Sequence, residues 1–239
     1  MKNTDPSELL AYGLHLGHKK NKIHPKAKRY IHSIEKGVSI IDLFQTSDLL
    51  DKAKTYAEEL GKNNKTLVVV ASKRGAREIV TELCKEHNVA YMTNKWVGGF
   101  LTNFDQVLKN IQKMNKMRED EKSGAWEDMP KHERNAEHKK LHRIETIYTG
   151  VAALTELPDA LFIIDIRKEH NAVIEAAQRK ITTIAVVDTN VNPEHITYPI
   201  PANDDAVLSI KYVSEAIIKS YADAKTKSSC KRGKKRSYQ

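Results

Sequence analysis

The sequence predicts an α/β fold in which helices cover both faces of a parallel sheet. Residues 67–71 and 160–164 are continuous apolar runs with branched side chains, as expected of strands buried on both faces. A segment with helical apolar spacing follows each run, so strands and helices alternate along the chain. No apolar run approaches the roughly 18 residues that a membrane-spanning helix needs.

The N-terminal part predicts a helix, a basic loop and a hairpin. Asp5 before a proline is a helix-start signal, and the loop that follows contains Pro25, which breaks any helix. Two short extended stretches, residues 30–34 and 38–43, flank a turn that contains Gly37.

The remaining elements alternate between strand and helix up to the C-terminal helix. They are expected at residues 48–60 (helix, ended by Gly61), 67–71 (strand), 75–86 (helix), 89–92 (strand), 160–164 (strand), 172–179 (helix), 183–187 (strand) and 206–224 (helix). Residues 183–187 are the last clear strand, because the proline-punctuated run after them indicates a loop.

One long segment, residues 103–154, does not fit this alternation and carries two helical apolar stripes. Gly124 and Pro130 lie in the joint between the stripes, so we expect an inserted antiparallel helical hairpin. Its stripes are narrow and flanked by charges, as in a two-stranded coiled coil. The predicted domains are the sheet domain (1–102 and 155–224), the hairpin (103–154) and a basic, disordered tail (225–239).

The net charge of +9 indicates a polyanionic partner, and its distribution says where that partner binds. Residues 18–36, here called the basic segment, hold seven basic residues and one acidic residue. The tail holds seven basic residues and no acid, so the rest of the chain carries −4. The basic segment is expected to contact phosphates, whereas the tail serves either phosphate binding or solubility.

The two cysteines and the N-terminus indicate the compartment. Cys84 lies on a helical apolar pattern and Cys230 in the polar tail, which favours neither a disulfide framework nor a cysteine zinc site. The first ten residues contain Asp5 and no apolar core, unlike a signal peptide. We expect a cytosolic location, or an organelle that makes the protein itself, and no membrane partner.

The best candidate for a nucleotide-binding loop follows the strand at residues 67–71. It has the single glycine Gly75 where a dinucleotide loop needs three, and the chain has no Walker motif. Three basic residues remain at the start of the next helix: Lys73, Arg74 and Arg77. A helix N-terminus with such charges suits a polyanion, and a solvated helix start is the alternative.

The run KWVGGFLTNF, residues 95–104, is the most unusual segment. Gly98 and Gly99 indicate a backbone that needs room or positive φ, as in an enzyme lid or a backbone packed against RNA. For Trp96, burial in the core is favoured over base stacking.

Candidate metal ligands and catalytic carboxylates have simpler interpretations. His138 and His142 are spaced i, i+4 with Glu145 nearby, but the lysine-rich surroundings favour a solvated helix face. Local hydrogen bonds are favoured for His15 and His18. We therefore predict no metal.

Acidic and amide side chains also follow the predicted strands, as ligand-binding groups do in α/β enzymes. Asp165 and Asp188 each end a strand, and Asn190 follows closely. No DxDx[TV] motif or nearby nucleophile accompanies them, so we interpret the two aspartates as caps and turn formers.

Several of these motifs, taken in order, carry a family resemblance. They are Gly13-Leu-His15-Leu-Gly17-His18, Pro25-Lys26, Ile40-Ile-Asp42-Leu43, Lys73-Arg74 with Ala76-Arg77, Trp96-Val-Gly98-Gly99 with Leu101-Thr102-Asn103, Leu157-Pro158-Asp159-Ala160-Leu161-Phe162, Glu169-His170 with Ala172-Val173, Val187-Asp188-Thr189-Asn190, and Ile200-Pro201 with Asn203-Asp204-Asp205-Ala206. The set resembles the small-subunit ribosomal protein S-two family of bacterial or organellar type.

That resemblance implies a flavodoxin-like sheet with an inserted helical hairpin, assembly into the small ribosomal subunit, and no catalysis. It also implies contacts with 16S-type ribosomal RNA and neighbouring proteins at the junction of head and body, with the S-one protein among the bacterial partners. No cofactor or small-molecule substrate is expected.

We predict that RNA is bound mainly by electrostatic contacts to phosphates, which position a protein and carry little sequence information. The candidate RNA-binding residues are His18, Lys19, Lys20, Lys22, Lys26, Lys28, Arg29, Lys73, Arg74, Arg77, Lys95, Trp96, Gly98, Gly99, Asn103, Lys231, Arg232, Lys234, Lys235 and Arg236. Two alternatives stay open: a nucleotide- or phosphate-handling enzyme using Asp165, Asp188 and Asn190, and a free protein-interaction module using the hairpin.

Overall fold

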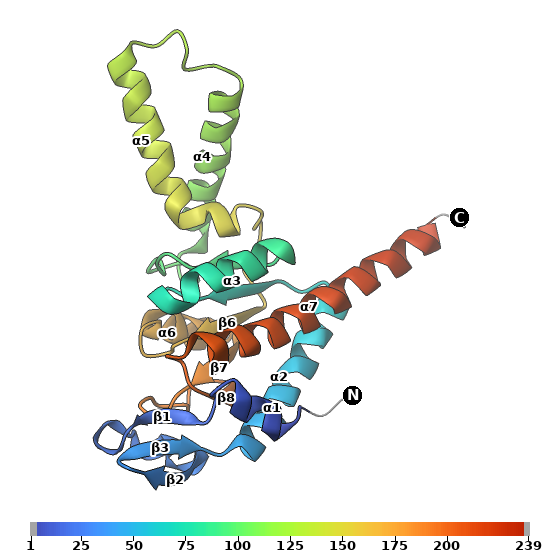
Figure 1. Cartoon of the computed structure of the whole chain (residues 1–239). Coiled ribbons are helices and arrows are strands. Elements are labelled where there is room, and N and C mark those ends of the chain that lie inside the picture. The colour runs from blue at the N-terminus through green and yellow to red at the C-terminus, as the bar shows by residue number, and fades with distance from the viewer. Residues whose placement is uncertain (1–3, 237–239) are drawn as a thin grey trace.

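A computed structural model describes the backbone of residues 4–236 and the side chains of residues 4–228 (Figure 1). Its helices are α1 (Pro6–Ala11), η1 (Lys20–Lys22), η2 (Pro25–Tyr30), α2 (Leu43–Lys62), α3 (Arg74–Glu86), α4 (Phe104–Lys122), α5 (Lys131–Tyr148), η3 (Thr149–Val151), α6 (His170–Arg179) and α7 (Val207–Arg236), the η elements being 3-10 helices. Its strands are β1 (Leu16–Lys19), β2 (Ile31–Glu35), β3 (Val38–Ile41), β4 (Leu67–Val70), β5 (Ala90–Met92), β6 (Ala160–Ile164), β7 (Thr182–Val187) and β8 (Tyr198–Pro201). Within these residues, no helix combines the length and the apolar character needed to cross a membrane.

The main sheet has five parallel strands in the order β5-β4-β6-β7-β8. Counted along the chain from β4, this is the order 2-1-3-4-5 of flavodoxin-like folds. The predicted fold class is therefore confirmed. The order reverses between β4 and β6, which is where such sheets usually bind ligands.

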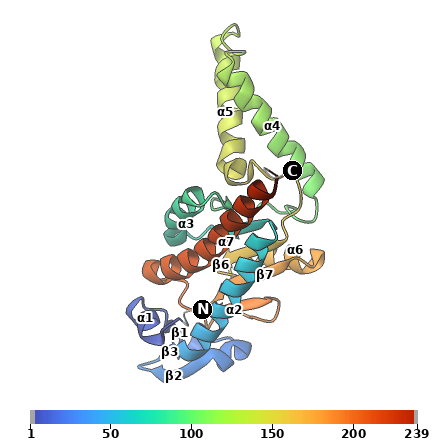
Figure 2. The same ribbon diagram turned by 90° about the vertical axis from the view of Figure 1, so that its right-hand side faces the viewer.

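Alternate residues of the central strands face two separate hydrophobic clusters, as the two-residue period of a strand requires. Val69 and Phe162 pack with helices α2, α3 and α7, whereas Val68 and Leu161 pack with α6 and the base of the α4–α5 pair. Figures 1 and 2 show these helices on opposite sides of the sheet. Both faces are thus buried, which explains the continuous apolar runs in the sequence.

Helices α4 and α5 project away from the sheet as a pair joined by a turn (Figures 1 and 2). The guanidinium Nε of Arg118 on α4 lies 2.6 Å from a carboxylate oxygen of Glu145 on α5. At the base of the pair, Gly150 packs so closely on Tyr91 of β5 that a Cβ atom would collide with it. The two helices are as expected, whereas a coiled coil and the domain boundaries at 103 and 154 stay predictions.

A second, three-stranded antiparallel sheet with the order β1-β3-β2 carries the basic segment. The loop predicted there is wrong in two places. Leu16 pairs with Ile40, so residues 16–19 form an edge strand, and Pro25 begins the helix η2. Proline has the φ of a first helical turn and needs no donor there, so it starts this helix and breaks none.

The loop predicted after β7 is also wrong in part, because β8 pairs with it along Tyr198–Pro201. The N–H of Ala202 donates to the carbonyl of Val187, so even-numbered residues here direct their N–H groups toward β7. The backbone nitrogens of Pro199 and Pro201 therefore point away from β7, toward the side of β8 that pairs with no strand among the described residues. A missing N–H interrupts no hydrogen-bond ladder there.

Helix α7 runs on to Arg236, where the sequence predicts a disordered tail from residue 225. Its path is anchored on α2: Gly61 lies against the backbone of Tyr221, and Ser228 Oγ donates to the carbonyl of Lys62 at 2.8 Å. Extending an anchored helix costs far less than nucleating one. The side chains of residues 229–236, including Cys230, lie outside the described residues.

Candidate nucleic-acid interface

All five strands of the main sheet end at one edge, here called the carboxyl edge, because they run parallel. The residues that follow these strands include Lys73 and Arg74 after β4, Lys95 after β5, Asp165 after β6, Asp188 after β7, and Asp204 and Asp205 after β8. The fold therefore gathers at one edge residues that are far apart in the sequence.

The basic segment is fastened to this edge where β7 ends. His18 Nδ1 lies 2.9 Å from Oδ2 of Asp188, and the backbone N–H of His18 donates to Thr189 Oγ1 at 2.9 Å. Gly17 makes this approach possible, since a Cβ there would lie 2.6 Å from Ser39 Oγ and 2.8 Å from the Thr189 methyl. The strand-end motif Asp188-Thr189 thus holds β1, a role beyond the cap and turn predicted for Asp188.

Protonation of His18 would strengthen this attachment. The hydrogen bond to Asp188 raises the pKa of His18 above its ordinary 6.5, burial opposes that shift, and Asp204 and Asp205 add to it. The other ring nitrogen, Nε2, faces Asn190 Nδ2 at 3.0 Å and Asp205 Oδ2 at 3.6 Å. In the neutral ring Nε2 accepts from the Asn190 amide, whereas in the protonated ring it carries a proton and faces the carboxylate of Asp205.

Beyond His18 the basic segment presents its charges to solvent. Five of its predicted contacts are exposed, and in the described part of the chain none has a carboxylate at ion-pair distance: Lys19, Lys20, Lys22, Lys28 and Arg29. Lys26 is also exposed but pairs with Glu194. Five cations without ionic partners form a surface suited to phosphates.

Lys73, predicted as a phosphate contact, is instead bound by the protein's own carboxylates. Its Nζ lies 2.7 Å from Asp205, 2.8 Å from Asp204 and 3.4 Å from Asp165. Burial would lower the pKa of Lys73, but the carboxylates outweigh burial and hold it above its ordinary value. Burial also raises the pKa of Asp204 to about 6, against the pull of Lys73.

The other cations at the carboxyl edge differ in whether protein groups already bind them. Arg77 donates from Nε to the carbonyl of Thr93 at 3.0 Å and from a terminal nitrogen to that of Asn94 at 3.3 Å. Arg74 and Lys95 are exposed, and neither has an ion pair within the part that the structure describes. Arg77 therefore links the start of α3 to the segment that carries Lys95.

The segment from Trp96 to Thr102 is organised by one carboxylate, Glu175 on α6. The Trp96 indole N–H and the Gly99 N–H donate to its Oε1 at 3.0 and 2.9 Å, and the Leu101 N–H donates to its Oε2 at 2.9 Å. Burial raises the pKa of Glu175, but these hydrogen bonds outweigh burial, so the pKa lies below the ordinary 4.5.

This arrangement separates Trp96 from its glycine neighbours as a candidate contact. Only 7% of Trp96 is exposed, which leaves little ring surface for a base and fits the favoured core interpretation. Gly98 is exposed, Gly99 has a φ of +86°, and Asn103 is exposed at the start of α4. Lys231, Arg232, Lys234, Lys235 and Arg236 have side chains outside the described residues.

Three groups at the carboxyl edge have metal-ligand chemistry: His18, Asp188 and Asp205 offer ligand atoms that lie within 4.8 Å of one another. An imidazole with two carboxylates suits a zinc-type ion. In this structure the same carboxylates are balanced by His18 itself and by Lys73.

The sheet's reversal point between β4 and β6 is occupied by protein groups. The Ser72 N–H donates to Glu169 Oε1 at 3.0 Å, and Lys168 Nζ donates to the Ser72 carbonyl at 2.7 Å. Asp165 accepts from the N–H groups of Arg167 and Lys168 at 3.1 Å, which is the predicted capping role. Asp165 and Asp188, two of the groups that the enzyme alternative requires, are thus engaged in structural contacts.

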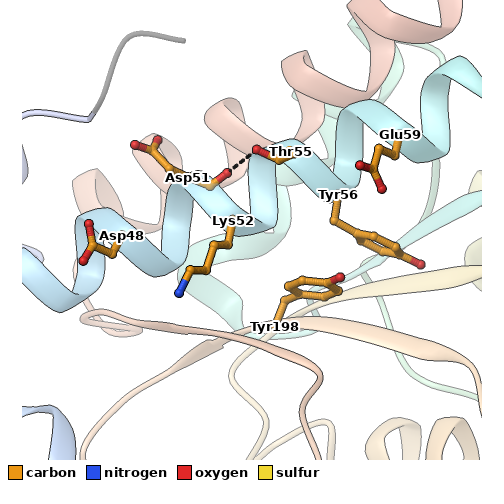
Figure 3. Close-up of a pocket in the computed structure, with 7 residues that line it drawn as sticks. All are labelled: Asp48, Asp51, Lys52, Thr55, Tyr56, Glu59 and Tyr198. Carbon is orange, nitrogen blue, oxygen red and sulfur yellow. Dashed lines mark hydrogen bonds between the residues drawn. The ribbon is translucent and has the colours of Figure 1, made fainter.

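A groove of about 580 Å³ lies away from this edge, between α2 and β8 (Figure 3). The rings of Tyr56 and Tyr198 stack there with centroids 4.6 Å apart, beside the carboxylates of Asp48 and Glu59. Carboxylates repel phosphates, so the groove is not part of the candidate interface.

Sequence reasoning missed Thr189 and Glu175 as organising residues. Glu175 had a visible signal, because it interrupts the apolar helix run AVIEAA next to two buried positions, Ala172 and Ala176. A carboxylate at such a position needs buried donors. Thr189 stands in the strand-end motif Val187-Asp188-Thr189-Asn190, but the motif does not identify its partner, because His18 lies 171 residues away.

Comparisons with known proteins agree with these features. The family model described as "Ribosomal protein S2" matches residues 9–224. The chain is 38% identical over 218 residues to the small ribosomal subunit protein uS2 of Dictyoglomus thermophilum, covering 91% of this chain and 89% of that protein. It is also 38% identical over 223 residues to uS2 of Cytophaga hutchinsonii, covering 93% of this chain and 88% of that protein.

Proposed function

This chain belongs to the ribosomal protein S2 family, and on that premise we propose that its exposed basic segment docks the protein onto small-subunit ribosomal RNA. The family is a structural component of the ribosome, so the chain is a small-subunit ribosomal protein and not an enzyme. The enzyme alternative is discarded on that ground.

One observation carries the proposal: cations that have no ionic partner among the described side chains are held on a rigid support. Lys19, Lys20 and Lys22 are exposed, while the adjacent His18 is fastened to Asp188 at the end of a central strand. A preorganised cation loses less conformational freedom on binding than one on a mobile loop. Arg74, Lys95 and the Gly98–Gly99 backbone extend the same surface along the carboxyl edge.

The finer parts of the proposal come from the family resemblance. They are a position at the junction of the subunit's head and body, contacts with neighbouring small-subunit proteins, and the S-one protein as one partner. The groove lined by Tyr56, Tyr198 and several carboxylates is outside the proposed RNA surface. The expected place of the protein in the cell is the ribosome.

The test is the salt dependence of binding between the full chain and small-subunit ribosomal RNA. Replacing Lys19, Lys20 and Lys22 with Ala is expected to weaken binding and to lower the slope of log K against log salt by about 0.7–0.9 per lost contact. The matched control replaces three exposed lysines away from the edge, Lys52, Lys62 and Lys85, and leaves the slope near that of the parent. Equal slopes for both triple variants would overturn the role of the basic segment.

A further inference from the structure

The α4–α5 pair separates its charges along its length. Its proximal part, residues 104–118 and 138–148, holds seven basic and two acidic residues. Its distal part, residues 119–137, here called the tip, holds seven acidic and three basic residues, a net charge of −4. The two parts therefore favour partners of opposite charge.

The tip also lies far from the rest of the molecule. Figures 1 and 2 show it at the far end of the projecting helices. The 15 residues of α4 before the tip span about 22 Å at the rise of an α-helix. Only the cations nearest the boundary reach the tip: Lys140 pairs with Glu137 at 3.1 Å, whereas the cations nearer the sheet lie beyond the Debye length of about 8 Å at physiological salt.

The turn in the tip is already ordered. The N–H groups of Gly124 and Ala125 donate to the carbonyls of Glu121 and Asp120 at 3.2 and 3.0 Å, and Gly124 has a φ of +75°. Trp126 is only 6% exposed and meets the ring of His138 edge-on, with centroids 5.2 Å apart. A partner would thus meet a preformed surface.

That surface contains a cavity of about 260 Å³ lined by Glu121, Gly124, Trp126, Glu127, Arg134 and His138. The exposed carboxylates of Glu121 and Glu127 suit a lysine or arginine side chain through ion pairing, whereas the Trp126 ring is buried and shapes the cavity floor without offering a free face. Glu121 pairs with His138 at 2.8 Å, and Glu127 packs over Gly124, where a Cβ atom would lie 3.3 Å from the Glu127 carboxyl carbon. Phosphate, by contrast, would be repelled.

We propose that the tip docks onto a lysine- or arginine-bearing segment of a neighbouring protein in the small subunit, while the proximal part faces RNA. This inference rests on the proposed assembly into that subunit. It divides the projecting pair into an RNA side and a protein side.

Site-specific photo-crosslinking within assembled small subunits tests the division. The tip variant is Met129→Cys, at a residue that is 37% exposed. The matched proximal control is Lys113→Cys, also at an exposed residue. Both variants carry Cys230→Ser, and the buried Cys84 thiol, whose pKa burial raises to about 12, stays unlabelled. Each cysteine receives a benzophenone maleimide before assembly.

The tip probe is expected to crosslink to a lysine- or arginine-rich peptide of another protein, and the proximal probe to ribosomal RNA. Adding Glu127→Gln and Asp128→Asn should reduce the tip crosslink about tenfold, with the proximal yield unchanged. Three outcomes would each overturn the proposal. They are a tip probe that crosslinks to RNA, a tip probe that gives no crosslink while the proximal probe gives a strong one, and a tip yield that is unchanged by the neutralising substitutions. If labelled chains never enter the subunit, the assignment to it fails instead.

Discussion

His18 Nδ1 lies 2.9 Å from Asp188 Oδ2, so the first residue of the basic segment is bonded to the end of a central strand 170 residues away. The segment therefore behaves as part of the sheet's edge. Its cations are presented on a support fixed by the core.

This bond makes stability depend on pH in a defined direction. The pKa of His18 is raised by Asp188, so its contribution is full below the ordinary 6.5 and is lost as pH rises through the higher folded value. Asp204, whose pKa is raised to about 6, acts in the same direction below that pH, and Lys73 and Asp205 keep their charges throughout.

Urea unfolding between about pH 6 and about pH 8.5 should thus show stability falling with pH, and His18→Gln should flatten the profile. A parent profile that stays level across this window would contradict the assigned charge of His18.

Lys73 and Arg74 are neighbours with opposite expected roles. Lys73→Met leaves three carboxylates without their cation and should lower the free energy of unfolding by about 3–5 kcal/mol. Arg74→Met removes an exposed cation and should change that free energy by less than about 0.5 kcal/mol while weakening RNA binding. Chemical denaturation and RNA titration of both variants check this, and equal stability losses would refute it.

Glu175 should be worth more to stability than a surface carboxylate. Glu175→Ala leaves the indole N–H of Trp96 and the backbone N–H of Leu101 without their acceptor. The free energy of unfolding should fall by about 3 kcal/mol. Because the pKa of Glu175 lies below 4.5, its contribution is present above that pH and is lost as pH falls through the lower folded value.

The matched control is Glu78→Ala on α3, an exposed position where little change is expected. Tryptophan fluorescence during urea unfolding reports both variants. A Glu175→Ala variant as stable as the control would show that the loop does not depend on this carboxylate.

Gly17 should tolerate no side chain. Gly17→Ala forces a Cβ to 2.6 Å from Ser39 Oγ and 2.8 Å from Thr189, and such overpacking costs about 1–3 kcal/mol. RNA binding should weaken with it, because β1 carries Lys19. Gly98→Ala is the control for stability, since nothing lies within 4 Å of a Cβ there. Comparable thermal stability of the two variants would argue against tight docking of β1.

The sequence predicted the elements whose pattern is set locally. Strands β4, β6 and β7 are continuous apolar runs, and α3 shows its stripe of Ala76, Val80 and Leu83. The family resemblance implied a flavodoxin-like sheet, but the strand order itself comes from the structure, because local pattern does not fix it. Helix α2 begins at Leu43 rather than 48, since Asp42 accepts from the Phe44 N–H and caps it there.

The elements that the sequence missed depend on distant partners. β1 is polar and contains Gly17, and it is a strand because Leu16 pairs with Ile40 and Thr189 holds its backbone. The three carboxylates around Lys73 come from loops after two different strands. The prediction of Lys73 as an RNA contact used its charge and its place at a helix N-terminus, and neither feature reveals that distant carboxylates surround it.

The outward-facing prolines of β8 have a consequence for the newly made chain. The β8 edge of the main sheet lacks donors at residues 199 and 201, and Thr46 Oγ1 already donates to the Pro201 carbonyl at 2.6 Å. Another copy of the chain would find few groups with which to extend the sheet, which is how natural proteins prevent edge-to-edge aggregation. Before it enters the small subunit, the chain is thereby protected from polymerising with itself through this edge.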